Sequence, residues 1–110
     1  MIFTSKIIIV KFSDVDELSV SLLFEKIFEV LEENKDTRFL IFDFKRVSYV
    51  GSSMVSGFIS VHNRYEKTDT KISFCNMKPN IKRVFEILKL DKLMDIKNSL
   101  REILQDISEE

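Results

Sequence analysis

Apolar residues along this chain follow two spacings that alternate from one end to the other. Compact apolar runs rich in β-branched and aromatic residues predict strands at 6–12, 38–44 and 71–75, with a short one within 91–96. Between them, apolar positions recur every three or four residues and predict helices at 19–33, 54–65, 79–88 and 99–107. The order is β-α-β-α-β-α-β-α, which favours an α/β fold with much parallel pairing and right-handed crossovers.

Local signals refine several of these elements. The run 38–44 is almost wholly apolar, so we expect it to be covered on both faces. Pro79 suits the first turn of the third helix, and Ser99 with Glu102 has capping-box spacing. Ser19 or Ser21 is the expected cap of the first helix.

Bulk composition predicts one globular domain, residues 1–110, with 45% hydrophobic residues. Seventeen basic and eighteen acidic residues give a net charge of −1, so no nucleic-acid partner is expected. No signal-peptide pattern and no apolar run of about 18 residues is present, so we expect no membrane insertion. The single cysteine, Cys75, lies in an apolar run, which indicates a buried thiol and fits a reducing cytoplasm.

A search for catalytic groups predicts no enzyme, no cofactor and no metal site. The only histidine, His62, has no second histidine or nearby cysteine to complete a zinc site, and a surface or packing role suits it. Ser52 lies about three helical turns from His62, roughly 15 Å, too far for a hydrogen bond. The two glycines, Gly51 and Gly57, are too few for a phosphate-binding loop. The acidic cluster at 14–17 is interpreted as a solvated turn.

Ser52 and Ser53 mark the point where the strand pattern gives way to the second helix. Ser53 is the expected helix cap, because a serine oxygen can accept a bond from a free amide of the first turn. Ser52 follows Gly51, which leaves room to expose the hydroxyl. A phosphate on Ser52 would meet the positive end of the helix, and its charge of about −2 would repel an acidic or apolar partner.

Three stretches resemble the STAS domain family, in particular the single-domain anti-sigma factor antagonists of bacteria. They are "FSDVDELSVSLLFEKI", "RFLIFDFKRVSYVGSSMVSGFISV" and "KISFCNMKPNIKRVFEILKLDKLMDIKNSLREIL". The second is similar to the family's buried strand followed by an Asp-Ser-Ser/Thr-Gly switch. The third contains an Asn-x-x-Pro loop and a helix ending near Leu-Asp.

The resemblance implies a STAS-like fold, a mixed β-sheet of about four to five strands covered by about four helices. It makes Ser52 the phosphoacceptor, with Ser53 as second choice, and implies a partner-binding surface of Asp16, Gly51, Ser52, Ser53 and Met54. The implied partners are an anti-sigma factor serine kinase, which would use ATP to phosphorylate the serine and weaken the complex, and a phosphatase that would reverse this. A monomer or weak dimer is expected.

The chain departs from the family pattern at three positions. Gly51 stands where Asp is usual, and Met54 and Lys89 stand where Gly is common. Met54 has two interpretations, core packing or an adaptable partner contact. Gly51 favours a second interpretation of the whole protein, an unphosphorylated accessory subunit of a lipid-transporting ABC complex or a scaffold in a stress-sensing assembly. A third interpretation is a binder of nucleotides or lipids.

Overall fold

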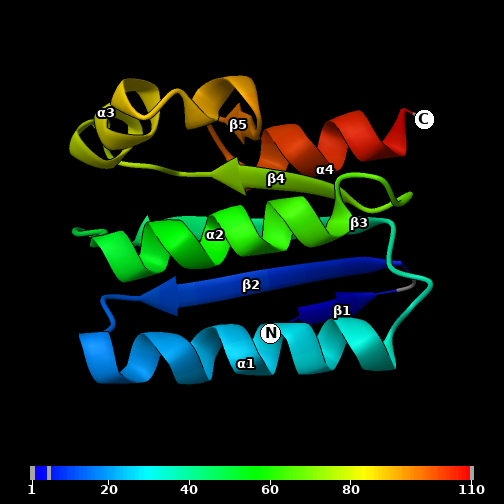
Figure 1. The fold of residues 1–110 in the computed structure, drawn as a ribbon. Helices are drawn as coiled ribbons and strands as arrows, with labels where there is room; N and C mark the ends of the chain where they lie inside the picture. Colours follow the sequence, from blue (N-terminus) through cyan, green and yellow to red (C-terminus); the bar gives the residue numbers. More distant parts are fainter. Residues whose placement is uncertain (1, 5, 110) are drawn as a thin grey trace.

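The computed structural model describes residues 2–4 and 6–109, with side chains described from Lys6 to Glu109. Figure 1 shows two strands in succession, followed by helices and strands that alternate along the chain. The strands are β1 (Ile2–Thr4), β2 (Ile7–Ser13), β3 (Phe39–Arg46), β4 (Lys71–Cys75) and β5 (Asp95–Lys97), and the helices are α1 (Glu17–Glu33), α2 (Ser52–Tyr65), α3 (Pro79–Ile87) and α4 (Leu100–Ser108), with a 3-10 turn at Leu90–Lys92.

The five strands form one mixed sheet in the order β1-β2-β3-β4-β5. β1 pairs with β2 antiparallel, and the remaining neighbours are parallel. The predicted α/β class and mixed sheet are confirmed. β1 was not predicted from the sequence. The short strand expected within 91–96 lies at the end of that run, as Asp95–Lys97, because the 3-10 turn occupies its start.

Alternate side chains of the sheet build two apolar clusters. The larger one packs α1, α2 and α3 against one face, and its centre is a group of phenylalanine rings that includes Phe42, Phe44, Phe58, Phe74 and Phe85. The smaller one packs Ile103 of α4 with Ile9, Ile41 and Cys75. β3 is buried from Leu40 to Phe44, as its apolar run predicted.

Side-chain caps mark the starts of α1 and α4, and the predicted cap of α1 was wrong. Asp16, rather than Ser19 or Ser21, caps α1: its carboxylate accepts the Ser19 amide at 2.8 Å. An aspartate side chain reaches the free amides of the first turn from this position, so the helix begins at Glu17. The Ser99 cap of α4 is confirmed, since its hydroxyl oxygen accepts the Glu102 amide at 3.1 Å.

α1 and α2 lie side by side, and their amino ends sit at the same end of the molecule as the carboxyl ends of β2 and β4 (left in Figure 1). Gly57 permits their close approach, because a Cβ there would lie 2.2 Å from the ring of Phe24. This packing brings the β2–α1 loop next to the start of α2, where the sequence predicts the serine switch.

Candidate functional site: the start of helix α2

Ser52 is the first residue of α2 and is exposed to solvent. Among the described residues, its hydroxyl makes no hydrogen bond. The preceding residue, Gly51, occupies the N-cap position with an extended backbone (φ −90°, ψ 177°) and no side chain to bond the first turn. The hydroxyl therefore lies open at the electropositive end of a 14-residue helix.

Gly51 is not required by its backbone angles, which any residue adopts. What its missing side chain provides is space, since a Cβ there would lie 3.1 Å from the hydroxyl oxygen of Tyr49. Tyr49 is 69% exposed and lies over this position.

Ser53 does not cap α2, so that expectation was wrong. Its hydroxyl donates instead to the Oε2 atom of Glu17, at 3.2 Å. The reason is tertiary: α1 begins with Glu17 beside the start of α2, which offers the hydroxyl a charged acceptor. The two adjacent serines thus have different surroundings, one unbonded and exposed, the other half-buried and bonded to a carboxylate.

The acidic cluster at 14–17 is more than the solvated turn we expected. Asp14 accepts the amide of Ser48 at 2.8 Å, the hydroxyl of Ser48, and the amide of Tyr49 at 3.3 Å. Hydrogen bonds from Ser48, its hydroxyl first, hold the pKa of Asp14 below its ordinary value. Asp14 therefore ties the β2–α1 loop to the segment 47–51, which we call the connector because it joins β3 to α2.

Asp16 faces its own helix. Ser19, through its side chain and its amide, lowers the pKa of Asp16. Within the described residues, Glu17 rather than Asp16 contacts the serine pair. Sequence reasoning missed Asp14 and Glu17 because their partners lie 34 and 36 residues away along the chain.

A second loop also holds the connector. The Lys78 ammonium donates to the carbonyl oxygens of Lys45 (3.0 Å) and Val47 (2.8 Å), and the Asn80 side chain donates to the carbonyl of Ser48 (3.1 Å). These donors belong to the Asn-x-x-Pro segment and the first turn of α3, so the motif noted in the sequence holds the chain that leads into Ser52.

A small cavity of about 120 Å³ lies between the starts of α1 and α2. Met54 forms part of its lining and is only 4% exposed, which favours the core-packing interpretation of this residue. The lining residues are Val15, Glu17, Val20, Tyr49, Gly51, Ser53 and Met54.

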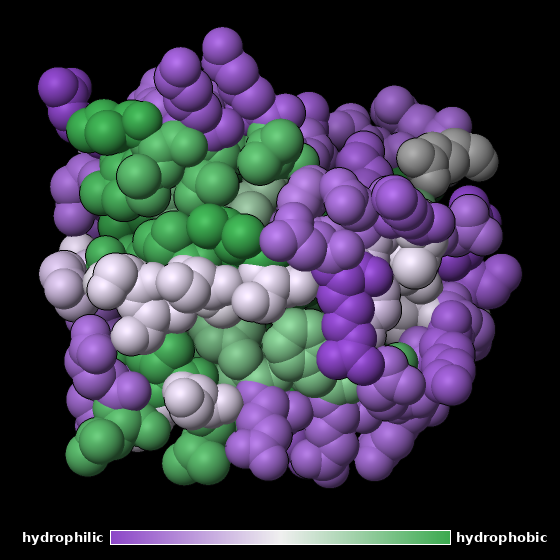
Figure 2. All heavy atoms as spheres, in the orientation of Figure 1, coloured by the Kyte–Doolittle hydropathy of each residue, from purple (hydrophilic) through white to green (hydrophobic). Residues whose placement is uncertain are grey.

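Apolar side chains also reach the surface beside this site. Leu18 and Leu22, one turn apart on α1, are 88% and 65% exposed. Figure 2 shows apolar residues gathered on the left of the helical face, at the end where α1 and α2 begin, while the right side is mostly hydrophilic. These side chains leave apolar surface exposed at the end of the molecule where α1 and α2 begin.

The rest of the described chain offers little for catalysis. No group of three or more potential metal ligands is found in residues 6–109. His62 is half-buried, with Nε2 3.6 Å from the Glu66 carboxylate. Cys75 is buried, and burial raises the pKa of its thiol to about 12, so it is protonated and unreactive.

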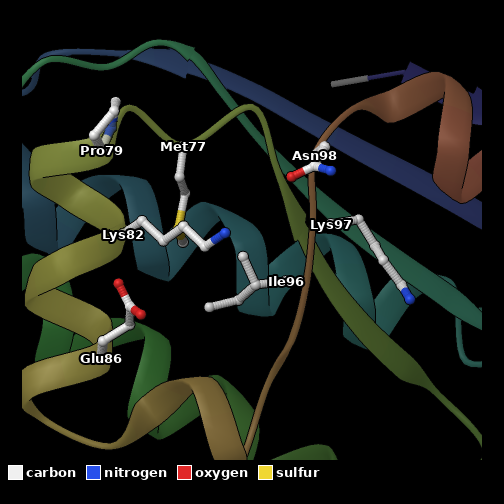
Figure 3. Close-up of a pocket in the computed structure, with 7 residues that line it drawn as sticks. All are labelled: Met77, Pro79, Lys82, Glu86, Ile96, Lys97 and Asn98. Carbon is white, nitrogen blue, oxygen red and sulfur yellow. The ribbon is translucent and has the colours of Figure 1, made fainter.

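A larger cavity, about 440 Å³, lies between α3 and β5. Figure 3 shows Met77 and Ile96 directed into it and Lys97 turned away. Its charged lining groups are Lys82, Glu86 and Lys97. As for the membrane, none of the helices described has both the length and the apolar character needed to cross one.

A comparison with family models matches residues 3–103 to the STAS domain. The chain belongs to the STAS domain family. The match covers every strand but the first residue of β1, all of α1 to α3 and the first part of α4. A comparison with curated proteins finds no match.

Solved structures share this STAS fold over nearly the whole chain. The anti-sigma factor antagonist SpoIIAA in its unphosphorylated form is 18% identical, with a TM-score of 0.75 over 99% of this chain and 94% of that one. SpoIIAA of Bacillus in the phosphorylated form gives the same identity and TM-score over 97% and 96%.

Two further STAS-fold structures match more closely in shape. One is a proposed anti-sigma factor antagonist from Thermotoga maritima, 13% identical, with a TM-score of 0.83 over 96% of this chain and 90% of that one. The other is a serine-to-glutamate variant of Moorella thermoacetica RsbS, 14% identical, with a TM-score of 0.83 over 99% and 96%. At these identities the likeness establishes the fold.

Proposed function

We propose that this protein is an anti-sigma factor antagonist that binds an anti-sigma serine kinase and is released when Ser52 is phosphorylated. A phosphatase would restore the binding form. The single observation that carries the proposal is the exposed, unbonded Ser52 hydroxyl at the uncapped start of α2. Membership of the STAS family and the structural neighbours described as anti-sigma factor antagonists support it.

The start of α2 offers favourable surroundings for a phosphate at Ser52. The uncapped amides and the positive end of α2 favour an anion there. The same dianion would obstruct a partner that covers this end, because covering it would take the charge out of water, which is costly. Phosphorylation would thus change binding while leaving the domain folded.

The proposed partner surface is Asp16, Gly51, Ser52 and Ser53, with Met54 beneath it in the core. The role is a binding one, and we propose no catalytic residue, metal or cofactor for it. We further propose that the protein acts in the cytoplasm of a bacterium as a monomer or weak dimer, as an element of transcription regulation.

Substitutions at Ser52 test this proposal directly. Ser52→Asp places a negative charge at the helix start and should weaken binding to the kinase at least tenfold, about 1.4 kcal/mol. Ser52→Ala should bind as the wild type does and should stay bound in the presence of ATP. Calorimetric titration of the purified kinase with each variant gives the result, and equal affinity for Ser52→Asp and wild type would contradict the proposal.

One feature favours a second function, an accessory or scaffold subunit that is never phosphorylated. Gly51 stands where the family usually carries an aspartate beside the serine. A pull-down with the wild-type protein separates the two: a histidine-kinase-like ATPase supports the antagonist, and a transporter ATPase supports the accessory subunit.

A further inference from the structure

The two adjacent hydroxyls at the start of α2 differ in their electrostatic surroundings. Ser53 donates to the Glu17 carboxylate at 3.2 Å and forms part of the wall of the small cavity, together with Val15 and Val20. Ser52 is exposed and is bonded to no carboxylate among the described residues. A chemical change that adds negative charge therefore meets different neighbours at the two positions.

Phosphoryl transfer from ATP forms an ester bond to the serine Oγ, breaks the bond between the γ-phosphorus and its bridging oxygen, and releases ADP and the hydroxyl proton. At Ser53, this removes the proton that Glu17 accepts. It also attaches a dianion to the Ser53 Oγ atom, which lies 3.2 Å from the Glu17 carboxylate. At Ser52, the same group would project into solvent at the helix end.

We propose that Glu17 makes Ser53 the less favourable of the two positions for a phosphate: by repelling a phosphate there, it favours Ser52 as the position of the switch. This inference rests on the proposed function, because it concerns the same phosphorylation. The charge of Glu17 acts on the neighbouring Ser53, and Glu17 would not itself take part in phosphoryl transfer. It is therefore a specificity-determining residue.

The test needs no kinase, since phosphoserine can be incorporated at either position during translation. Four phosphoproteins are compared: phosphoserine at 52 or at 53, each with Glu17 or with Glu17→Gln. We expect phosphoserine at 53 to raise the unfolding equilibrium constant at least about tenfold relative to phosphoserine at 52, and Glu17→Gln to remove most of that difference. The unphosphorylated Glu17→Gln variant is the control. It shows how much stability is lost when the acidic residue in the first turn of α1 is neutralised without any phosphate present.

Salt gives a second readout that a purely structural role of Glu17 would not produce. The Glu17 carboxylate and a phosphate on Ser53 would both lie close to solvent. Added salt should therefore reduce the difference in unfolding equilibrium constant between the two phosphoproteins. Equal stability of the two phosphoproteins, or a gap that Glu17→Gln leaves unchanged, would overturn the inference. Neither result would affect the proposed function, which depends on how Ser52 substitutions alter kinase binding.

Discussion

Lys89 lies in the left-handed region of backbone space at the end of α3, with φ 60° and ψ 24°. A side chain with a Cβ is unfavourable there, and glycine is the usual residue after a helix. The resemblance noted in the sequence implies a Gly near the end of this helix, so the lysine found here has a physical consequence.

Replacing this lysine should stabilise the protein. Lys89→Gly removes the Cβ strain and should raise the free energy of unfolding by about 0.5–1 kcal/mol after the entropy gained by the unfolded chain is subtracted. The matched control is Lys82→Gly in the exposed middle of α3, which should lower it by about 1 kcal/mol. Urea unfolding of both variants checks the prediction, and a destabilised Lys89→Gly would contradict it.

Asp14 gives a prediction with a defined pH dependence. Hydrogen bonds from Ser48 lower its pKa in the folded state, so the unfolded chain binds more protons as the pH falls. Its contribution to stability is therefore present above the unfolded pKa, near 3.8, and is lost as the pH falls through the lower folded pKa.

The measurement compares the melting temperatures of wild type and Asp14→Asn. Wild type should melt higher at about pH 7, and the difference should shrink towards about pH 3. Asp16 also has a lowered pKa. Because both proteins contain Asp16, its effect cancels in the difference between their melting temperatures. A constant difference across this pH range would show that the Asp14 charge contributes nothing.

At this scale the sequence allowed only part of the site to be predicted. Ser52 followed from the change of pattern at 51–54 and from the family resemblance. The contacts of Asp14, Glu17 and Lys78 with the segment around it did not, because each joins residues more than 30 positions apart. Periodicity reports which face of an element is buried, but it contains no information on which loops meet.

The pairing of α1 with α2 is the main constraint at the scale of elements. Gly57 is the point of closest approach, with Phe24 of α1 filling the space where its Cβ would be. In a helix with free space around it, Gly→Ala stabilises the protein by roughly 1 kcal/mol. The sign of the stability change at Gly57 therefore shows whether a neighbouring side chain fills that space.

Gly57→Ala should destabilise the protein by about 1–3 kcal/mol, because the ring of Phe24 is buried and cannot move freely. Ser56→Ala, at the exposed neighbouring position, is the control and should be neutral or slightly stabilising. Pairing Gly57→Ala with Phe24→Leu should recover part of the loss, measured as a coupling energy in a double-mutant cycle. A stabilised Gly57→Ala would show that the helices lie further apart.

The elements themselves were largely predictable. Long periodic segments gave all four helices and the three longer strands, and β3 was recognised as buried from its unbroken apolar run. The errors concerned the short strands: β1 was not predicted, and β5 was expected within 91–96 but lies at Asp95–Lys97. Each has three residues, too few to show a period. Their pairing with longer strands, rather than their own sequence, makes them part of the sheet.

The whole molecule is organised so that one end carries the proposed switch. Parallel pairing of β2, β3 and β4 places their carboxyl ends together, and the loops that follow them supply Asp14, the connector and Lys78. The sheet and the phenylalanine core support these loops, and hydrogen bonds from Asp14 and Lys78 join them to the segment that leads to Ser52.

The measurement that tests this account most directly is site-resolved mass spectrometry of the protein after incubation with ATP and the anti-sigma serine kinase of the same organism. The account predicts one added phosphate on Ser52, none on the Ser52→Ala variant, and release of the modified protein from the kinase. An unmodified protein, or a phosphate at another residue, would contradict the claim that the open hydroxyl at the start of α2 is the switch.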